Sequence, residues 1–334
     1  APFPPPPLAP PSRMCSLTLL DGGNAQEIWH RSGENPARLW SLSCLFSDPD
    51  LVRQVHLDFL RAGSRVLTLH NYAATPSRLW RDRDELPGFL PAADAADPAT
   101  ALTALHRQAA RLAAEAREAA YAEGTAPAGS IRLAGCLPPL VASYHAEVIP
   151  PEEEAIAEYR QLVAVQAEAV DLFLAETLSS QREVRAVLAA TAEIDRPLWV
   201  ALTVDDEKPA AVRSGESLAD LLAAFPDAAG PEAWLLNCST PEAITAALPL
   251  LREGTGKPCG AYANGFVSVT ELAPGGTVDS LRRRPEASPQ RYAEWAGEWA
   301  GMGATLIGGC CETGPEHLRA AAAALRQAGY PLPG

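Results

Sequence analysis

One pattern repeats along the chain: a short apolar segment, a polar turn and then an amphipathic helical stretch. The apolar segments are nearly continuous runs, which is typical of parallel strands that are buried on both faces. Eight of them are present, at residues 17–22, 65–71, 131–137, 172–177, 198–204, 234–239, 259–264 and 305–310. Eight strands that alternate with about eight helices predict an α/β protein built as a single (β/α)8 TIM barrel.

The stretches between the strands have the apolar spacing of helices. A period near 3.6 predicts helices at residues 50–62, 99–122, 151–169, 241–251 and 315–328. We expect three prolines just inside helix starts: Pro151, Pro241 and Pro315. At the first helical position an N–H would have no partner within the helix, so proline costs no hydrogen bond there. A doubly wound open sheet is the alternative fold. The first strand runs into LLDGGNAQE instead of a GxGxxG turn, and no Walker-type loop is present, so the barrel is favoured.

The first thirteen residues differ from the rest of the chain. The segment APFPPPPLAPPSR holds seven of the 31 prolines, and proline lacks an N–H and favours an extended, solvated backbone. We therefore expect a disordered proline-rich arm at residues 1–13 and a barrel domain at residues 14–330, with Met14 as a candidate natural start. A dispensable leader is the favoured interpretation of the arm, and a ligand for an SH3-like module is the alternative.

Composition narrows the classes of partner. The 334 residues carry a net charge of −14, whereas phosphate binding needs clustered Lys and Arg, so neither nucleic acid nor an anionic membrane is an expected partner. No apolar run reaches the ~18 residues of a membrane-spanning helix, and the start does not read as a signal peptide. We expect a cytoplasmic protein that acts on small molecules, as a monomer or a small homo-oligomer.

Polar and thiol side chains stand where the predicted strands end. Active sites of (β/α)8 barrels form at the carboxyl ends of the strands, so these side chains are the candidate active site. The positions are Asp21, Asn71, Tyr72, Glu176, Thr177, Asn237, Cys238, Asn264, Cys310 and Cys311.

The seven cysteines divide into two groups. An odd count without a signal peptide does not indicate a disulfide scaffold. Cys310 and Cys311 follow two glycines that allow the chain to bend, and with Cys238 they could hold zinc with its fourth position open, as in catalytic sites. Buried packing and a vicinal disulfide are the alternatives. The other four are expected to pack as small apolar residues: Cys15, Cys44, Cys136 and Cys259.

Four motifs carry a resemblance to a known family. LLDGG, ETLSS, LLNCS and LIGGCCETGPEHL resemble the homocysteine S-methyltransferase family of zinc-dependent barrels, and the similarity extends over residues 17–325. The resemblance implies a homocysteine-binding barrel in which Cys238, Cys310 and Cys311 hold Zn²⁺. It also implies that Glu176 receives the ammonium group of homocysteine, with Thr177 beside it. An ion pair at the barrel rim is the alternative role for Glu176.

Further substrate contacts follow from the same resemblance. It implies that Asp21, Gly22 and Gly23 lie beside the substrate, and that Tyr72 lies near the methyl donor. Asn264 matches the asparagine of the family's YPN motif at strand seven. A structural role in a turn or as a helix cap is the alternative for Asp21.

Three segments depart from the family pattern. Asn24 stands where the family commonly has methionine or alanine, and the strand-seven motif reads YANG. The loop after the third strand, GCLPPLVASYHAEVIPPEE, lacks the glycines of the usual GSxGPYGA. These segments should border the substrates, so the departures bear on substrate identity more than on reaction type.

The resemblance implies methyl transfer from a sulfonium donor to the zinc-bound thiolate of homocysteine, giving methionine. The chain stops soon after its last predicted helix, without the arm of betaine-dependent members or modules for folate and cobalamin. The expected donor is therefore S-methylmethionine or S-adenosylmethionine. One alternative keeps the site and uses another thiol or selenol acceptor, such as selenohomocysteine. The other is a non-catalytic sensor that binds zinc and thiols.

Overall fold

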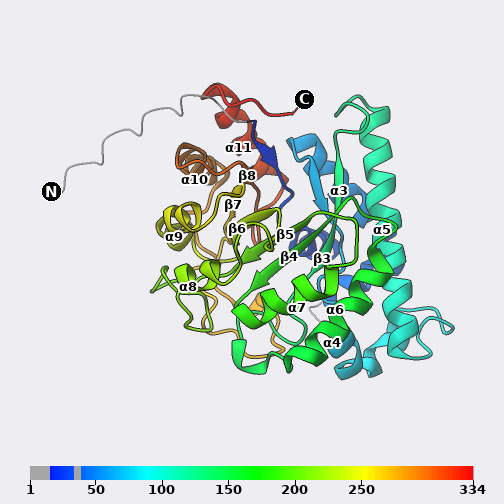
Figure 1. Cartoon of the computed structure of the whole chain (residues 1–334). Helices are drawn as coiled ribbons and strands as arrows, with labels where there is room; N and C mark the ends of the chain where they lie inside the picture. The colour runs from blue at the N-terminus through cyan, green and yellow to red at the C-terminus, as the bar shows by residue number, and fades with distance from the viewer. Residues whose placement is uncertain (1–15, 34–38, 334) are drawn as a thin grey trace.

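The computed structural model describes residues 16–33 and 39–333, and in this part of the chain eight parallel strands form one sheet (Figure 1). The order of neighbours in the sheet is β1-β8-β7-β6-β5-β4-β3-β2. A parallel bridge between Leu20 and Val66 joins the two ends of this order, and the N–H of Asp21 donates to the carbonyl of Val66 at 3.0 Å. The sheet is thus closed into the predicted barrel, and the open doubly wound sheet is excluded. The strands are β1 (Thr18–Leu19), β2 (Val66–Thr68), β3 (Arg132–Leu137), β4 (Leu172–Leu178), β5 (Leu198–Leu202), β6 (Ala233–Asn237), β7 (Cys259–Tyr262) and β8 (Leu306–Ile307).

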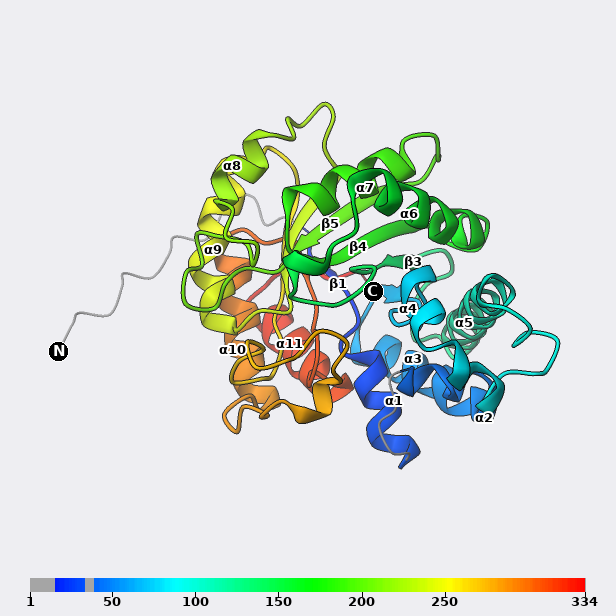
Figure 2. The ribbon, with the colours of Figure 1, turned by 90° about the horizontal axis from the view of Figure 1, so that it is seen from below.

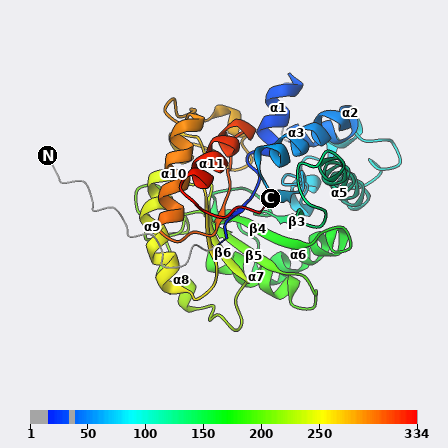
Figure 3. The ribbon, with the colours of Figure 1, turned by 90° about the horizontal axis from the view of Figure 1, so that it is seen from above.

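Helices surround the strands on all sides, as the views from below and above show (Figures 2 and 3). They are α1 (Asn24–Ser32), α2 (Cys44–Ser47), α3 (Pro49–Ala62), α4 (Pro76–Arg81), α5 (Pro98–Ala122), α6 (Glu152–Gln166), α7 (Gln181–Thr191), α8 (Leu218–Ala223), α9 (Pro241–Gly254), α10 (Pro289–Gly301) and α11 (Pro315–Gln327). Short 3₁₀ turns lie at Trp40–Leu42, Arg83–Gly88, Ala146–Val148 and Val278–Ser280. No helix in the described ranges is both long enough and apolar enough to cross a membrane.

Several predicted boundaries differ from the structure. Strands β1 and β8 end at Leu19 and Ile307, earlier than the predicted ends at Gly22 and Cys310. Pro241 and Pro315 open their helices as predicted, but Pro151 is the N-cap of α6 and lies just before it. The proline-rich arm at residues 1–13 and Cys15 lie outside the described residues.

Strand residues alternate between two apolar layers. In β4, Phe173 and Ala175 face the surrounding helices, whereas Leu172 and Leu174 point into the barrel. The interior layer also contains Leu20, Val66, Ala134, Trp199, Ala201, Ala233, Leu235, Tyr262 and Leu306. Because these side chains fill the barrel, a ligand can enter only beyond the ends of the strands.

Candidate active site

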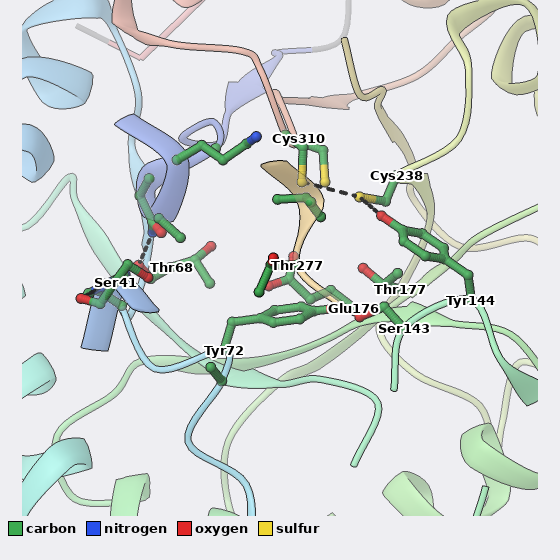
Figure 4. A pocket seen from close by; sticks show the side chains of 18 of the residues that line it. Ser41, Thr68, Tyr72, Ser143, Tyr144, Glu176, Thr177, Cys238, Thr277 and Cys310 are labelled. Atoms are coloured by element: carbon green, nitrogen blue, oxygen red, sulfur yellow. Dashed lines mark hydrogen bonds between the residues drawn. The ribbon is translucent and has the colours of Figure 1, made fainter. Parts of the chain in front are cut away.

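A cavity of about 160 Å³ lies at the carboxyl ends of the strands (Figure 4). Nine of the twelve predicted site residues line it, whereas Asn71, Asn237 and Asn264 do not. The amide oxygen of Asn264 instead accepts from the N–H of Phe266 at 3.1 Å, so this side chain shapes the turn after β7. The residues that line the cavity from the predicted set are Asp21, Gly22, Gly23, Tyr72, Glu176, Thr177, Cys238, Cys310 and Cys311.

Three thiols converge on one point of the cavity wall. The Sγ atoms of Cys238, Cys310 and Cys311 all lie within 4.8 Å of one another, and those of Cys238 and Cys311 are 3.9 Å apart. A tetrahedral zinc ion with Zn–S bonds near 2.3 Å would separate its sulfurs by about 3.8 Å, so the spacing fits such an ion. The three thiols are free, so the vicinal disulfide of the alternative interpretation is not formed.

The electrostatics of this cluster also suit a cation. Hydrogen bonds from Cys310 and Cys311 hold the pKa of Cys238 well below its usual value. The same contacts with Cys238 hold the pKa of Cys310 and of Cys311 well above theirs. The opposite directions follow from the close contact of the three sulfurs, because adjacent thiolates repel each other. A divalent cation would allow all three to ionise.

Backbone contacts fix the loop that carries Cys310 and Cys311. The N–H of Gly23 donates to the carbonyl of Thr313 at 2.9 Å, and the N–H of Gly309 donates to the carbonyl of Asp21 at 2.9 Å. A Cβ at Gly23 would lie 2.6 Å from the carbonyl oxygen of Cys310, closer than real contacts allow. Glycine is required there because the two loops touch through their backbones.

Glu312, which follows the paired cysteines, ties their loop to α1. Its carboxylate accepts from the amide of Gln26 at 2.7 Å, and its own N–H donates to the Gln26 oxygen at 2.6 Å. Arg283 forms an ion pair with the same carboxylate. Sequence reasoning did not identify Gln26 or Glu312, because neither residue stands at a strand end.

Tyr144 is a second residue that sequence reasoning missed. Its hydroxyl lies 3.0 Å from Sγ of Cys238, and Figure 4 shows it pointing at that sulfur. The guanidinium of Arg213 stacks over the Tyr144 ring at 5.2 Å and pairs with Asp206 at 2.9 Å. Tyr144 lies in the loop after β3, the segment that departs from the family pattern. The unusual sequence of this loop indicated that it differs from the family, but it did not identify Tyr144 itself.

Glu176 occupies the centre of the cavity wall on β4. The thiol of Cys136 donates to its Oε1 at 3.1 Å, and the hydroxyl of Tyr262 donates to its Oε2 at 3.3 Å. Removal from bulk water raises the pKa of Glu176 to about 7. Two neutral donors thus hold this carboxyl group, and within the described residues the predicted alternative of a rim ion pair is wrong. Cys136 is buried, as expected, but it also serves as a hydrogen-bond donor.

Asp21 is the second carboxyl group of the cavity. It accepts from the N–H and the hydroxyl of Thr68 at 2.9 and 3.0 Å, and from the amide of Asn24 at 3.4 Å. Burial, and then the charge of Glu176, raise the pKa of Asp21 to about 8. Gly23, not Asp21, is the N-cap of α1, so the helix-capping alternative is wrong.

Thr177 and Tyr72, two further predicted residues, are each held by side-chain hydrogen bonds. The N–H of Thr177 donates to the amide oxygen of Asn237 at 3.0 Å, and the Asn237 amide donates back to the Thr177 hydroxyl at 2.9 Å. The Tyr72 hydroxyl is 2.8 Å from that of Ser143, and the Arg78 guanidinium lies 5.2 Å from the centre of the Tyr72 ring. Tyr72 and Thr177 are therefore rigid parts of the wall.

Comparison with known proteins identifies the family. The family model described as Homocysteine S-methyltransferase matches residues 18–325. The chain belongs to this family. The homocysteine S-methyltransferase of Escherichia coli K12 is 32% identical over 91% of this chain and 94% of its own length. A selenocysteine methyltransferase of Astragalus bisulcatus is 28% identical over 90% of both chains.

Solved structures agree with this assignment. The metallated form of the homocysteine methyltransferase MmuM from Escherichia coli superposes with a TM-score of 0.74 at 28% identity, covering 92% of this chain and 96% of that one. As a member of the homocysteine S-methyltransferase family, this chain is a thiol methyltransferase enzyme. The three convergent cysteines are the described side chains that could hold a metal in it.

Proposed function

We propose that the enzyme transfers a methyl group from a sulfonium donor to homocysteine and so produces methionine. Cys238, Cys310 and Cys311 hold Zn²⁺ for this reaction. The observation that carries the proposal is that the three thiols open into the same cavity as two carboxyl groups, the buried Asp21 and the partly buried Glu176. One end of the cavity thus suits a sulfur acceptor, and the other suits an ammonium group.

Zinc fits the three cysteines by distance and by donor type, as the sulfur spacing and the free thiols indicate. When bound, Zn²⁺ removes the proton of a coordinated thiol and so keeps the acceptor sulfur nucleophilic at neutral pH. Tyr144 donates its hydroxyl hydrogen to Cys238 and covers this side of the cluster.

Glu176 and Asp21 bind the ammonium group of the acceptor. Both carboxyl groups have pKa values near neutrality when the cavity holds no cation. An ammonium group beside them favours their ionised forms, because an opposite charge within a few Å lowers the pKa of a carboxyl group. The two residues therefore recognise an amino acid instead of a simple thiol.

The transfer itself needs orientation more than proton movement. A lone pair of the acceptor sulfur forms a bond to the methyl carbon while the bond from that carbon to the donor sulfur breaks. The released electron pair neutralises the sulfonium charge, so no covalent intermediate with the protein is required. The rigid wall formed by Tyr72 and Thr177 aligns the two sulfurs and limits water. S-methylmethionine and S-adenosylmethionine both carry the required sulfonium.

A donor panel tests this proposal. Homocysteine is incubated with S-methylmethionine, S-adenosylmethionine or betaine, and methionine is followed. We expect product with a sulfonium donor and none with betaine. Purified protein should contain about one zinc per chain, which Cys310→Ser should lose together with activity. Cys259→Ser, a matched change at a buried cysteine outside the cavity, should retain both. Full activity in metal-free protein, or product with betaine alone, contradicts the proposal.

A selenol acceptor is the second candidate, and the Astragalus bisulcatus relative favours it because its name specifies selenocysteine. A selenol ionises more readily than a thiol and would use the same cavity. Competition between homocysteine, selenohomocysteine and selenocysteine separates the two candidates by the ratio of kcat/KM. Homocysteine ranks first if the main proposal holds, and last if the selenol is the true acceptor.

The cellular setting is part of the proposal. Cys136, Cys238, Cys259, Cys310 and Cys311 are in no disulfide, and thiols of this kind persist in a reducing compartment such as the cytoplasm. The substrates are small molecules. A monomer or a small homo-oligomer stays the prediction for the assembly, and light scattering of the purified protein tests it.

A further inference from the structure

Two neighbouring strands carry Cys136 and Glu176 into the barrel. In β3, Ala134 points into the barrel interior, and Cys136 follows it at a spacing of two residues. In β4, Leu172 and Leu174 point inward, and Glu176 comes next in the same series. Alternation along parallel strands therefore brings the thiol and the carboxyl group together just above the filled interior.

The carboxyl group of Glu176 is held from both sides. The Cys136 thiol donates to Oε1 at 3.1 Å. The hydroxyl of Tyr262, which comes from β7 on the opposite side, donates to Oε2 at 3.3 Å. The register of β4 against β5 shifts between Ala175 and Leu178, which redirects the strand at this point. Asn237 fixes the next peptide through Thr177. Backbone and side chain of Glu176 are thus both restrained.

Cys136 is suited to a lasting donor role. It is 1% exposed, and burial raises the pKa of its thiol well above the ordinary value, so the S–H hydrogen remains in place. A thiol is a weak donor with a long bond, and it leaves the second lone pair of Oε1 free for a stronger donor. The three cysteines of the cluster cannot do this, because they would be ionised around a metal.

We propose that Cys136 is a positioning residue that orients the Glu176 carboxylate toward the ammonium group of an amino-acid acceptor. It thereby sets the preference of the enzyme for thiols with an α-amino group over thiols without one. This inference rests on the proposed function, because it takes the acceptor to be an amino acid. Cys136 touches neither substrate nor metal and acts only through Glu176.

The test compares two acceptors that differ only in the amino group: homocysteine and 4-mercaptobutanoate. Zinc-loaded wild type, Cys136→Ala, Cys136→Ser and the control Cys259→Ala are studied by kinetics and by calorimetric binding of each acceptor. Without the thiol we expect KM and Kd for homocysteine to rise about tenfold, which corresponds to about 1.4 kcal/mol, with kcat changed less than threefold. Values for 4-mercaptobutanoate should stay unchanged.

The serine variant keeps a donor and should restore homocysteine binding to within about threefold of wild type. Rescue by serine also distinguishes a lost hydrogen bond from a loss of stability in the alanine variant. Thermal unfolding of all four proteins makes the same distinction. Equal losses for both acceptors, failure of serine to rescue, or a wild type that binds both acceptors alike overturns the inference. A wild type that binds homocysteine selectively but transfers no methyl group contradicts the proposed function alone.

Discussion

Removal of the Tyr144 hydroxyl should weaken metal binding while leaving the fold intact. This hydroxyl lies 3.0 Å from Sγ of Cys238, within hydrogen-bond range for sulfur. A bond to a thiolate is roughly twice as strong as a bond to a neutral thiol, so the hydroxyl favours the metal-bound state. Loss of an outer partner of a ligand typically costs 10- to 100-fold in metal affinity, or about 1.4–2.7 kcal/mol. We expect Tyr144→Phe to raise the zinc Kd by this factor.

The assay is competition for zinc against a coloured chelator of known affinity. Tyr72→Phe is the matched control, because it makes the same chemical change in the same cavity but removes a bond to Ser143. Its zinc Kd should stay within about twofold of wild type, as expected for a group that touches no ligand. An unchanged Kd for Tyr144→Phe would refute the reasoning. Tighter binding would refute it too, because the hydroxyl would then oppose the metal.

Three further predictions concern stability. Gly23→Ala should lose zinc and unfold at a lower temperature, because its Cβ would lie 2.6 Å from the Cys310 carbonyl oxygen; normal zinc content and Tm contradict this. Asn237→Ala should lower the free energy of unfolding by about 2–4 kcal/mol in urea titrations, since it leaves the buried N–H and hydroxyl of Thr177 without their partner. His56 is fully buried with both ring nitrogens unpaired, and burial, then the neighbouring His70, lower its pKa to about 3. Because the unfolded chain binds this proton more tightly, stability should fall as pH drops below about 6.5. His56→Phe should shift acid unfolding to lower pH; parallel pH profiles of the free energy of unfolding would contradict this.

The barrel could be predicted because its strands have a repeated local pattern. Each strand is apolar on both faces, and its last residues turn polar where the chain leaves the sheet. Position at a strand end was enough to bring Asp21, Glu176 and Cys238 together in one cavity. The same reasoning misplaced Asn71, Asn237 and Asn264, because a strand end does not specify whether a side chain faces the cavity or a neighbouring element.

The hydrogen bonds between side chains of the site could not be predicted from the hydrophobic periodicity of the sequence. Cys136 looked like a packing residue because a buried thiol has the size and polarity of a small apolar side chain. Its donor role depends on Glu176, which lies in β4 two residues beyond Leu174, the register partner of Cys136. Tyr144 lies in a loop without a repeating pattern, so its approach to Cys238 depends on contacts far apart in the sequence.

Backbone strain is concentrated around the cysteine cluster. In the described chain, the non-glycine residues with positive φ are Tyr144, Thr177, Cys238 and Glu312, at 70°, 63°, 48° and 61°. Each costs about 1–3 kcal/mol, so each persists only where neighbours enforce it. Each of the four residues has a specific contact. Arg213 stacks on the Tyr144 ring, and the Asn237 amide forms two hydrogen bonds with Thr177. The N–H of Cys238 donates to the Tyr262 carbonyl, and Gln26 bonds to both the N–H and the carboxylate of Glu312. All four residues are in or beside the cysteine cluster, so the strain is concentrated where three sulfurs must converge. The protein thus fixes the sulfur positions through its own contacts, as the proposed metal site requires.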